Sequence, residues 1–106
     1  MVKLNVVKMM KYYKIEWIHN WNKEYPFCYF IEVGDNFYET KKIEQYKDGR
    51  MYYADETMEC GTFLSPEPIT DINDFNSKDD DEIMKGVEIS KNVFFNEWRK
   101  LTKEKK

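Results

Sequence analysis

Phe37-Tyr-Glu-Thr-Lys-Lys-Ile-Glu-Gln-Tyr-Lys-Asp-Gly-Arg-Met-Tyr-Tyr-Ala-Asp-Glu56 carries the strongest structural signal in this chain. Asp48-Gly49, near its middle, has the composition preferred for a two-residue type I′ turn, in which both central residues take positive φ. Such a turn predicts a hairpin of two antiparallel strands, 37–47 and 50–56. It also predicts the register, with Lys42 opposite Asp55 and Lys41 opposite Glu56 as two ion pairs.

Two further strands are predicted before this hairpin. In Lys11 to His19 the apolar residues alternate with charged ones, which is typical of a half-buried strand. Phe27 to Val33 is almost continuously apolar and aromatic, so we expect it to be central in the sheet. A loop over 20–26 and a turn at Gly34-Asp35-Asn36 connect these strands.

The segments after the hairpin predict a crossing, a loop and a helix. Pro66 and Pro68 favour an extended surface crossing, and Thr70 is a candidate N-cap for a short helix over 70–75. The stretch 76–82 is expected to be a solvated acidic loop. Ser90 to Lys103 is the clearest helix, because Ser90 is a good N-cap and an apolar stripe recurs at helical spacing. That stripe consists of Phe94, Trp98 and Leu101.

These elements predict an α+β fold, an antiparallel four-stranded β-meander, with a fifth strand left open, packed against a C-terminal helix. The chain has 106 residues, of which 17% are aromatic, so it is large enough to bury one core without disulfides. We expect an N-terminal extension over 1–10, a single domain over 11–103 and a tail over 104–106.

Composition also predicts the setting of the protein. No apolar run approaches the roughly 20 residues that span a bilayer, and the N-terminus does not resemble a secretory signal. Cys28 and Cys60 are too few for a disulfide framework and are expected to be reduced thiols. The expected localisation is cytoplasmic, without membrane association.

Charge is distributed unevenly along the chain. The net charge is -3, but the segment from Asp55 to Glu88 holds eleven acidic residues against two lysines, a local balance of -9. Such polarity steers an oppositely charged partner. The candidate partner-binding residues are Asp71, Asp74, Asp79, Asp80, Asp81 and Glu82.

No group of residues predicts catalysis, a metal or a cofactor. His19 is the one histidine in the sequence, and no spacing places a nucleophile beside it. One histidine and two scattered cysteines do not form a familiar zinc set, and the run Asp79 to Glu82 lacks the spacing of a calcium loop. Aromatics and lysines interleave near the N-terminus, but an isoelectric point of about 5.2 argues against nucleic-acid binding. We therefore predict a non-enzymatic protein.

The strand over 37–47 is unusual because neither of its faces is cleanly apolar. A charged patch in the middle of a sheet is either a salt-bridged exposed face or a binding surface. The alternative function is therefore a small-ligand or regulatory module that uses this charged sheet face. Its candidate residues are His19, Glu32, Glu39, Lys41 and Arg50.

Three motifs stand out in the sequence: Trp17-Ile18-His19, the long stretch from Glu39 through Asp48-Gly49-Arg50 to Ala54, and Glu88-Ile89-Ser90-Lys91 with Phe94 and Trp98. Together they resemble a family of small bacterial domains of unknown function. The chain departs from the family pattern at Lys41, where the pattern has arginine, at Phe30, where it has tyrosine, and at Thr70, where it has proline. If that arginine makes a bidentate contact, Lys41 weakens it. The resemblance carries over no catalytic residue.

Small acidic α+β proteins of this size also resemble the immunity proteins of bacterial toxin systems, at the level of class. The leading expectation is therefore an immunity or antitoxin-like protein that binds a basic toxin domain through its acidic segment.

Overall fold

The computed structural model describes residues 9–20 and 24–103. Most of the expected N-terminal extension and the tail over 104–106 lie outside the described residues, as do 21–23 of the expected loop. The elements in chain order are β1 (Lys11–His19), β2 (Cys28–Val33), β3 (Glu39–Gln45), β4 (Met51–Asp55), β5 (Met58–Cys60), the 3₁₀ helix η1 (Ile72–Phe75), β6 (Ser77–Lys78), β7 (Glu82–Ile89) and α1 (Lys91–Lys103).

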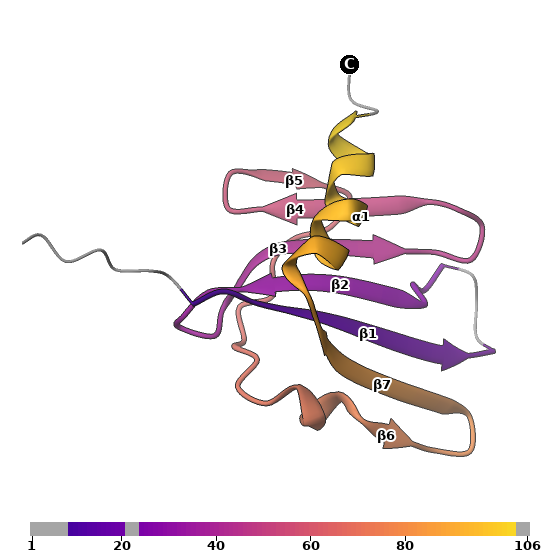
Figure 1. Cartoon of the computed structure of the whole chain (residues 1–106). Helices are drawn as coiled ribbons and strands as arrows, with labels where there is room; N and C mark the ends of the chain where they lie inside the picture. The colour runs from indigo at the N-terminus through magenta and orange to yellow at the C-terminus, as the bar shows by residue number, and fades with distance from the viewer. Residues whose placement is uncertain (1–8, 21–23, 104–106) are drawn as a thin grey trace, which may run out of the picture.

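The strands form one antiparallel seven-stranded sheet in the order β5-β4-β3-β2-β1-β7-β6. Strands β1 to β5 follow one another as a meander, and the chain then crosses to the far edge to add β6 and β7 beside β1 (Figure 1). The α+β class and the C-terminal helix agree with the sequence analysis. The prediction that β2 is central is confirmed, whereas the predicted strand count of four or five is too low.

Helix α1 covers one face of this sheet. Its Phe94, Trp98 and Leu101 are buried, and they pack with Tyr12 of β1, Phe30 of β2, Ile43 of β3 and Tyr53 of β4. Ser90 caps the helix, because the backbone N–H of Val93 donates to Ser90 Oγ at 3.1 Å. The predicted helix, its cap and its apolar stripe are therefore confirmed.

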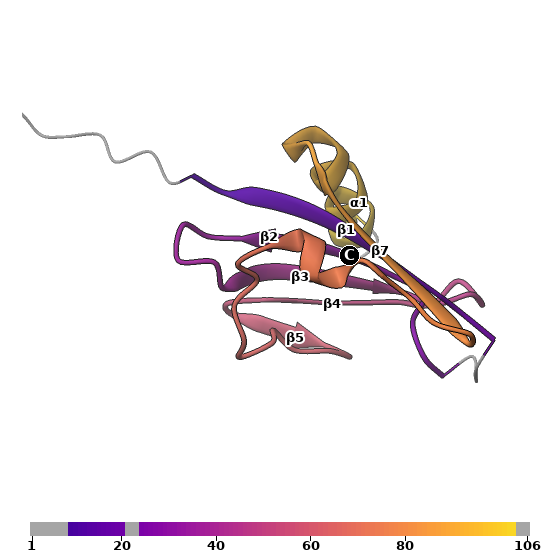
Figure 2. The ribbon, with the colours of Figure 1, turned by 90° about the horizontal axis from the view of Figure 1, so that it is seen from below.

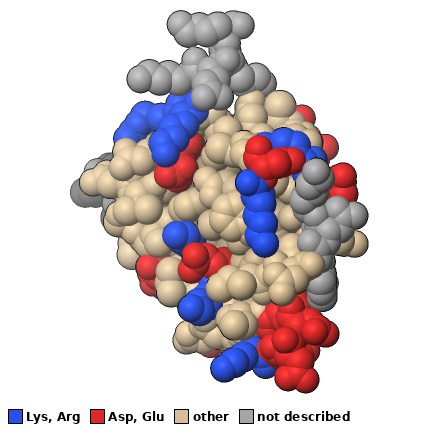
Figure 3. Space-filling model, turned by 90° about the vertical axis from the view of Figure 1, so that its right-hand side faces the viewer, with Lys and Arg blue, Asp and Glu red and all other residues tan. Residues whose placement is uncertain are grey.

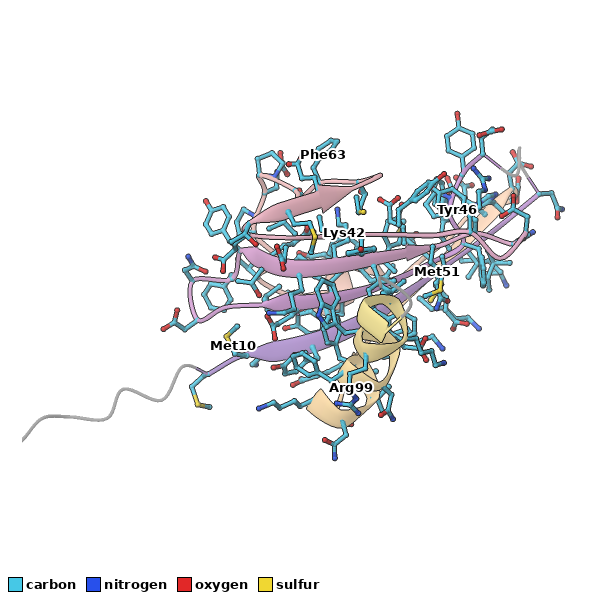
Figure 4. All side chains as sticks on the ribbon, turned by 90° about the horizontal axis from the view of Figure 1, so that it is seen from above. Met10, Lys42, Tyr46, Met51, Phe63 and Arg99 are labelled. Carbon is cyan, nitrogen blue, oxygen red and sulfur yellow. The ribbon has the colours of Figure 1, made fainter. Side chains whose placement is uncertain are left out.

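The opposite face is covered by the segment between β5 and β6, which passes behind the sheet in Figure 1. Ile69 of this segment is buried against Tyr13, Ile15, Ile31 and Val33. In Figure 2, seen from below, α1 and β5 lie on opposite sides of the central strands. In Figure 4 Phe63, near the start of the crossing segment, lies on the side of the sheet away from α1. The predicted extended crossing is confirmed.

The β3–β4 turn differs from the predicted two-residue type I′ turn. Tyr46 N–H donates to Arg50 O at 2.9 Å and Gly49 N–H to Tyr46 O at 3.0 Å, so the loop has three residues, 47–49. Gly49 has φ +95, whereas Asp48 is not among the described residues with positive φ. This is the arrangement in which a type I turn is followed by a glycine in the left-handed region.

The longer loop shifts the register by one residue. Lys41 lies opposite Asp55, and Lys42 lies opposite Ala54, so the predicted pairs Lys42–Asp55 and Lys41–Glu56 are wrong. The shift places Tyr53 opposite Ile43, on the face that α1 covers. The correct register therefore supplies an aromatic side chain to the core.

The stretch 70–89 also differs from expectation. Asp71, not Thr70, caps the short 3₁₀ helix η1, and the expected acidic loop over 76–82 includes strand β6 and the start of β7. Strand β7 was not predicted, although it pairs with β1 along eight residue pairs. Gly86 of β7 leaves room for η1, because a Cβ at this position would lie 3.0 Å from the backbone oxygen of Ile72.

Two glycines offer a matched test of the turn geometry. Gly49 and Gly61 both have positive φ, but a Cβ on Gly49 would meet no atom within 4 Å, whereas one on Gly61 would lie 2.5 Å from Cδ1 of Tyr52. We expect Gly49→Ala to lower the free energy of unfolding by about 1 kcal/mol through backbone strain alone. Gly61→Ala adds a clash, and we expect about 2–3 kcal/mol in total. Urea denaturation measures both, and equal losses would contradict the close approach of Tyr52 to Gly61.

Candidate functional site

The six predicted partner-binding residues all lie along the β6–β7 edge of the sheet. Asp79, Asp80 and Asp81 form the turn between the two strands, and Asp79 N–H donates to Glu82 O at 2.8 Å to close it. In Figure 3 a dense red group marks this turn at the lower end of the molecule. Asp71 caps η1 and Asp74 lies within it.

The η1 carboxylates are held beside β7 by the side chain of Asn76. Its Nδ2 donates to Gly86 O at 3.2 Å, and its Oδ1 accepts the Gly86 N–H at 3.0 Å. Gly86 and Glu82 are four residues apart in β7, or about 13 Å. The structure therefore assembles the acidic residues of two elements along one edge, which we call the acidic edge. It is defined by Asp71, Asp74, Asp79, Asp80, Asp81 and Glu82.

The charge of the acidic edge is largely uncompensated. Among the described residues, no lysine or arginine forms an ion pair with Asp71, Asp74, Asp79, Asp80 or Asp81. All five are exposed. The acidic residues earlier in the same run, Asp55, Glu56 and Glu59, lie at the β4–β5 edge instead, and six strand spacings, about 29 Å, separate β5 from β6. The acidic run of the sequence is therefore divided between separate surfaces.

Aromatic side chains adjoin the acidic edge. Trp17 Nε1 donates to Glu82 Oε1 at 2.6 Å, and the Trp17 ring lies 4.5 Å from that of His19 and 6.0 Å from that of Tyr25. His19 is buried, and its Nε2 donates to Pro26 O at 3.0 Å. Tyr25 remains 48% exposed. His19 therefore helps hold an aromatic cluster beside the acidic residues.

The candidate ligand-face residues do not share one surface. Glu32 and Lys41 lie on the α1 face, Glu39 on the opposite face, and Arg50 at the β3–β4 turn. His19 is seven residues along β1 from Tyr12, the partner of Glu32, so about 23 Å separates the two ends. The expected single charged sheet face is corrected to three separate groups. Glu39 and Lys41 are two residues apart and would share a face in a regular strand, but the β2–β3 register shifts between Glu32 and Val33, and this irregularity separates them.

Glu32 and Lys41 form a buried polar group beside α1. Glu32 is 3% exposed, and its Oε1 accepts Thr40 Oγ1 at 2.6 Å and Lys41 Nζ at 3.2 Å. Burial, together with a hydrogen bond to Glu32, raises the pKa of Tyr12 to about 12. Lys41 Nζ also lies 5.9 Å from the ring centres of both Phe95 and Trp98. Glu32 and Lys41 therefore form a network that contacts α1 and helps hold the helix against the sheet.

Glu39 and Lys42 form a second buried pair, on the other face. Their side chains are 4% and 11% exposed, with Lys42 Nζ 3.3 Å from Glu39 Oε1. Both also bind the backbone of the crossing segment. Ser65 N–H donates to Glu39 Oε1 at 2.8 Å, and Lys42 Nζ donates to Phe63 O at 3.2 Å. This pair therefore ties the crossing segment to β3.

The crossing segment encloses a pocket that sequence reasoning missed. Its volume is about 330 Å³, and it lies between the second face of the sheet and the stretch 65–69. The lining residues are Ile15, Tyr29, Ile31, Glu39, Lys42, Ser65, Glu67, Pro68, Ile69, Phe75 and Met84. The only hint of this pocket in the sequence was the group of charged residues within β3. Glu39 was named as a candidate ligand-binding residue, but its partner Lys42 was not.

Other kinds of site have little support in the part of the chain that is described. Within 9–20 and 24–103, no three His, Cys, Asp or Glu side chains gather in a way that would hold a metal ion. No helix of these residues is long and apolar enough to cross a membrane. Cys28 and Cys60 are not joined in a disulfide, and burial raises the pKa of Cys28 to about 11.

Comparison with known proteins identifies the family and gives no activity. A comparison with curated proteins and another with solved structures each return no match. A family model described as a domain of unknown function, DUF6881, matches residues 11–103, which include every strand and the helix. The chain therefore belongs to this DUF6881 family.

Proposed function

We propose that this chain is a non-enzymatic binding protein that neutralises a basic protein partner through its acidic edge, as a bacterial immunity or antitoxin protein does. The observation that carries the proposal is the group of exposed carboxylates on two elements without ion-pair partners among the described residues. Such a group raises the association rate of a cationic partner and disfavours acidic ones.

The neighbouring aromatic cluster supports a protein partner over a simple ion. Binding energy in protein interfaces is concentrated in aromatic and arginine anchors that a polar rim surrounds. Trp17 and Tyr25 offer ring surface, and the hydrogen bond from Trp17 to Glu82 fixes that surface beside the carboxylates. A single arginine side chain of the partner could stack on one of these rings and bind a carboxylate of the acidic edge at the same time.

The second function, a ligand module built on the charged sheet face, is less favoured by the geometry. Its residues occupy two faces and both ends of the sheet, and they bind one another or the backbone. A small molecule does not contact all of them at once.

Charge reversal on the two edges tests the proposed function. The partner for this test is a basic toxin domain sought among the products of the genes adjacent to the one for this chain. We expect Asp80→Lys/Asp81→Lys to weaken its binding at least about tenfold at low salt, because the reversed charges repel a basic surface. Titration calorimetry at two salt concentrations measures the change.

The matched control is Glu56→Lys/Glu59→Lys, which makes the same change in net charge at the opposite edge of the sheet. We expect this control to weaken binding no more than about twofold, since the interface is local and distant charges are screened. Equal weakening by both variants would mean that binding depends on the net charge of the protein and not on the acidic edge. Unchanged binding in Asp80→Lys/Asp81→Lys would refute the acidic edge as the interface.

A further inference from the structure

The pocket behind the sheet is a candidate site separate from the acidic edge. It measures about 330 Å³, which is at the small end of ligand-binding cavities. Its floor is apolar, with Ile15 and Ile31 from the central strands and Met84 from β7. Pro68 and Ile69 form the wall opposite the sheet. This shape and lining fit the apolar body of one small molecule.

Hydrogen bonds hold the walls of this pocket in place. The crossing segment is bound at Phe63 O by Lys42, at Ser65 N–H by Glu39, and at Ile69 N–H by Phe37 O at 2.8 Å. Phe37 has φ +72, a left-handed conformation that is rare for a bulky residue. A pocket whose wall is fixed at three points is preorganised, so a ligand does not have to order it.

The charge around the pocket favours a cation. Glu39 and Glu67 line it against the single cation Lys42. Lys42 already binds Glu39 and the carbonyl of Phe63, so an incoming anion meets a neutralised ammonium. Ser65 and Lys42 both contact Oε1 of Glu39, and no described residue donates a hydrogen bond to its Oε2.

Tyr29 supplies the remaining polar group. Its hydroxyl has no hydrogen-bond partner among the described residues, although the side chain is half-buried and lines the pocket. Burial and the nearby carboxylates of Glu44 and Glu39 raise the pKa of Tyr29, so the hydroxyl is neutral at physiological pH. A neutral hydroxyl accepts a hydrogen bond from an ammonium group.

We propose that this pocket binds a small apolar amine, with its ring or branched chain on Ile15, Ile31 and Met84 and its ammonium group between Tyr29 and Glu39. The site lies on a face of the sheet and the acidic edge lies along its border, so the proposal is independent of the proposed function. Either one can fail without the other.

Three probes that differ in the head group test the ligand class. They are phenethylamine, 2-phenylethanol and 3-phenylpropionate, which share a phenyl ring on a short chain. We expect phenethylamine to bind with a Kd of about 1 mM or below, a strength typical of a molecule this small. It should bind at least about fivefold more tightly than the alcohol and tenfold more tightly than the carboxylate, because the local carboxylates attract the cation. Amide chemical shifts from NMR titration measure the affinities and locate the site.

Two tyrosine variants identify the residue that holds the head group. Tyr29→Phe keeps the ring and removes the hydroxyl, and we expect it to weaken phenethylamine binding about five- to tenfold. Tyr38→Phe makes the same change at an exposed position outside the pocket lining, and we expect no change. Tighter binding of the carboxylate, shifts centred away from Ile15 and Ile31, equal effects of both variants, or no binding by any probe would each overturn the proposal.

Discussion

Lys42→Met is expected to lower the free energy of unfolding by about 3–5 kcal/mol, because it removes one partner of a buried ion pair. Glu39 is left with its side chain 4% exposed and without the ammonium that lies 3.3 Å away. The crossing segment also loses the bond from Lys42 to Phe63 O. Methionine preserves most of the apolar stem, so the loss reports the charge and the hydrogen bond.

A surface pair provides the control for this variant. Lys100 lies 3.2 Å from Glu97 in α1, but its side chain is 63% exposed. Lys100→Met is therefore expected to cost less than about 1 kcal/mol, as exposed pairs do. The double variant Lys42→Met/Glu39→Gln should recover part of the loss, since the amide oxygen still accepts the Ser65 N–H and no buried charge remains. Urea denaturation gives all three values, and a loss for Lys42→Met as small as that for Lys100→Met would refute the buried pair.

The Lys42–Glu39 pair also shows where sequence reasoning reaches its limit. The alternation in β3 indicated that its charges were either a salt-bridged face or a binding surface. Lys42 and Glu39 bind each other and the backbone at 63 and 65, which lies 21 and 26 residues further along the chain, respectively. No local pattern contains that contact, because it depends on where the crossing segment passes. The pocket is hidden from the sequence for the same reason.

Elements with strong local signals were predicted well. Strand β1 spans Lys11–His19 as its alternation indicated, and α1 starts after its Ser90 cap. Asp48-Gly49 did indicate a hairpin, but these two residues suit both a two-residue and a three-residue loop. The choice depends on whether Asp48 takes positive φ, which composition does not determine. The position of the hairpin was therefore predicted correctly, while the register of its two strands was predicted wrongly by one residue.

Strand β7 illustrates a tertiary effect that outweighs local propensity. It contains Gly86 and several charged residues, and glycine weakens a strand interior. Its pairing with β1 brings together residues about 70 positions apart, and η1 requires the absence of a side chain at Gly86. The strand is thus stabilised by contacts on both sides rather than by its own sequence.

Phe94→Ala is expected to lower the free energy of unfolding by about 4 kcal/mol, the cost of removing a large aromatic side chain from a core. Phe94 is 0% exposed, and its ring centre lies 5.3 Å from Tyr12 and 6.1 Å from Trp98. The cavity would therefore open between α1 and the sheet. A helix of 13 residues has little stability of its own, so α1 depends on this packing.

The preceding residue in the same helix is the matched control. Val93 is 45% exposed, and Val93→Ala is expected to change the stability by no more than about 0.5 kcal/mol. Urea denaturation followed by circular dichroism measures both variants, and similar values would contradict the packing of α1 on the sheet. If Phe94→Ala remains folded at low temperature, its acidic edge should still bind a basic partner, because that edge is built by β6, β7 and η1 rather than by the helix. The stability supplied by α1 and the binding proposed for the acidic edge are then separable.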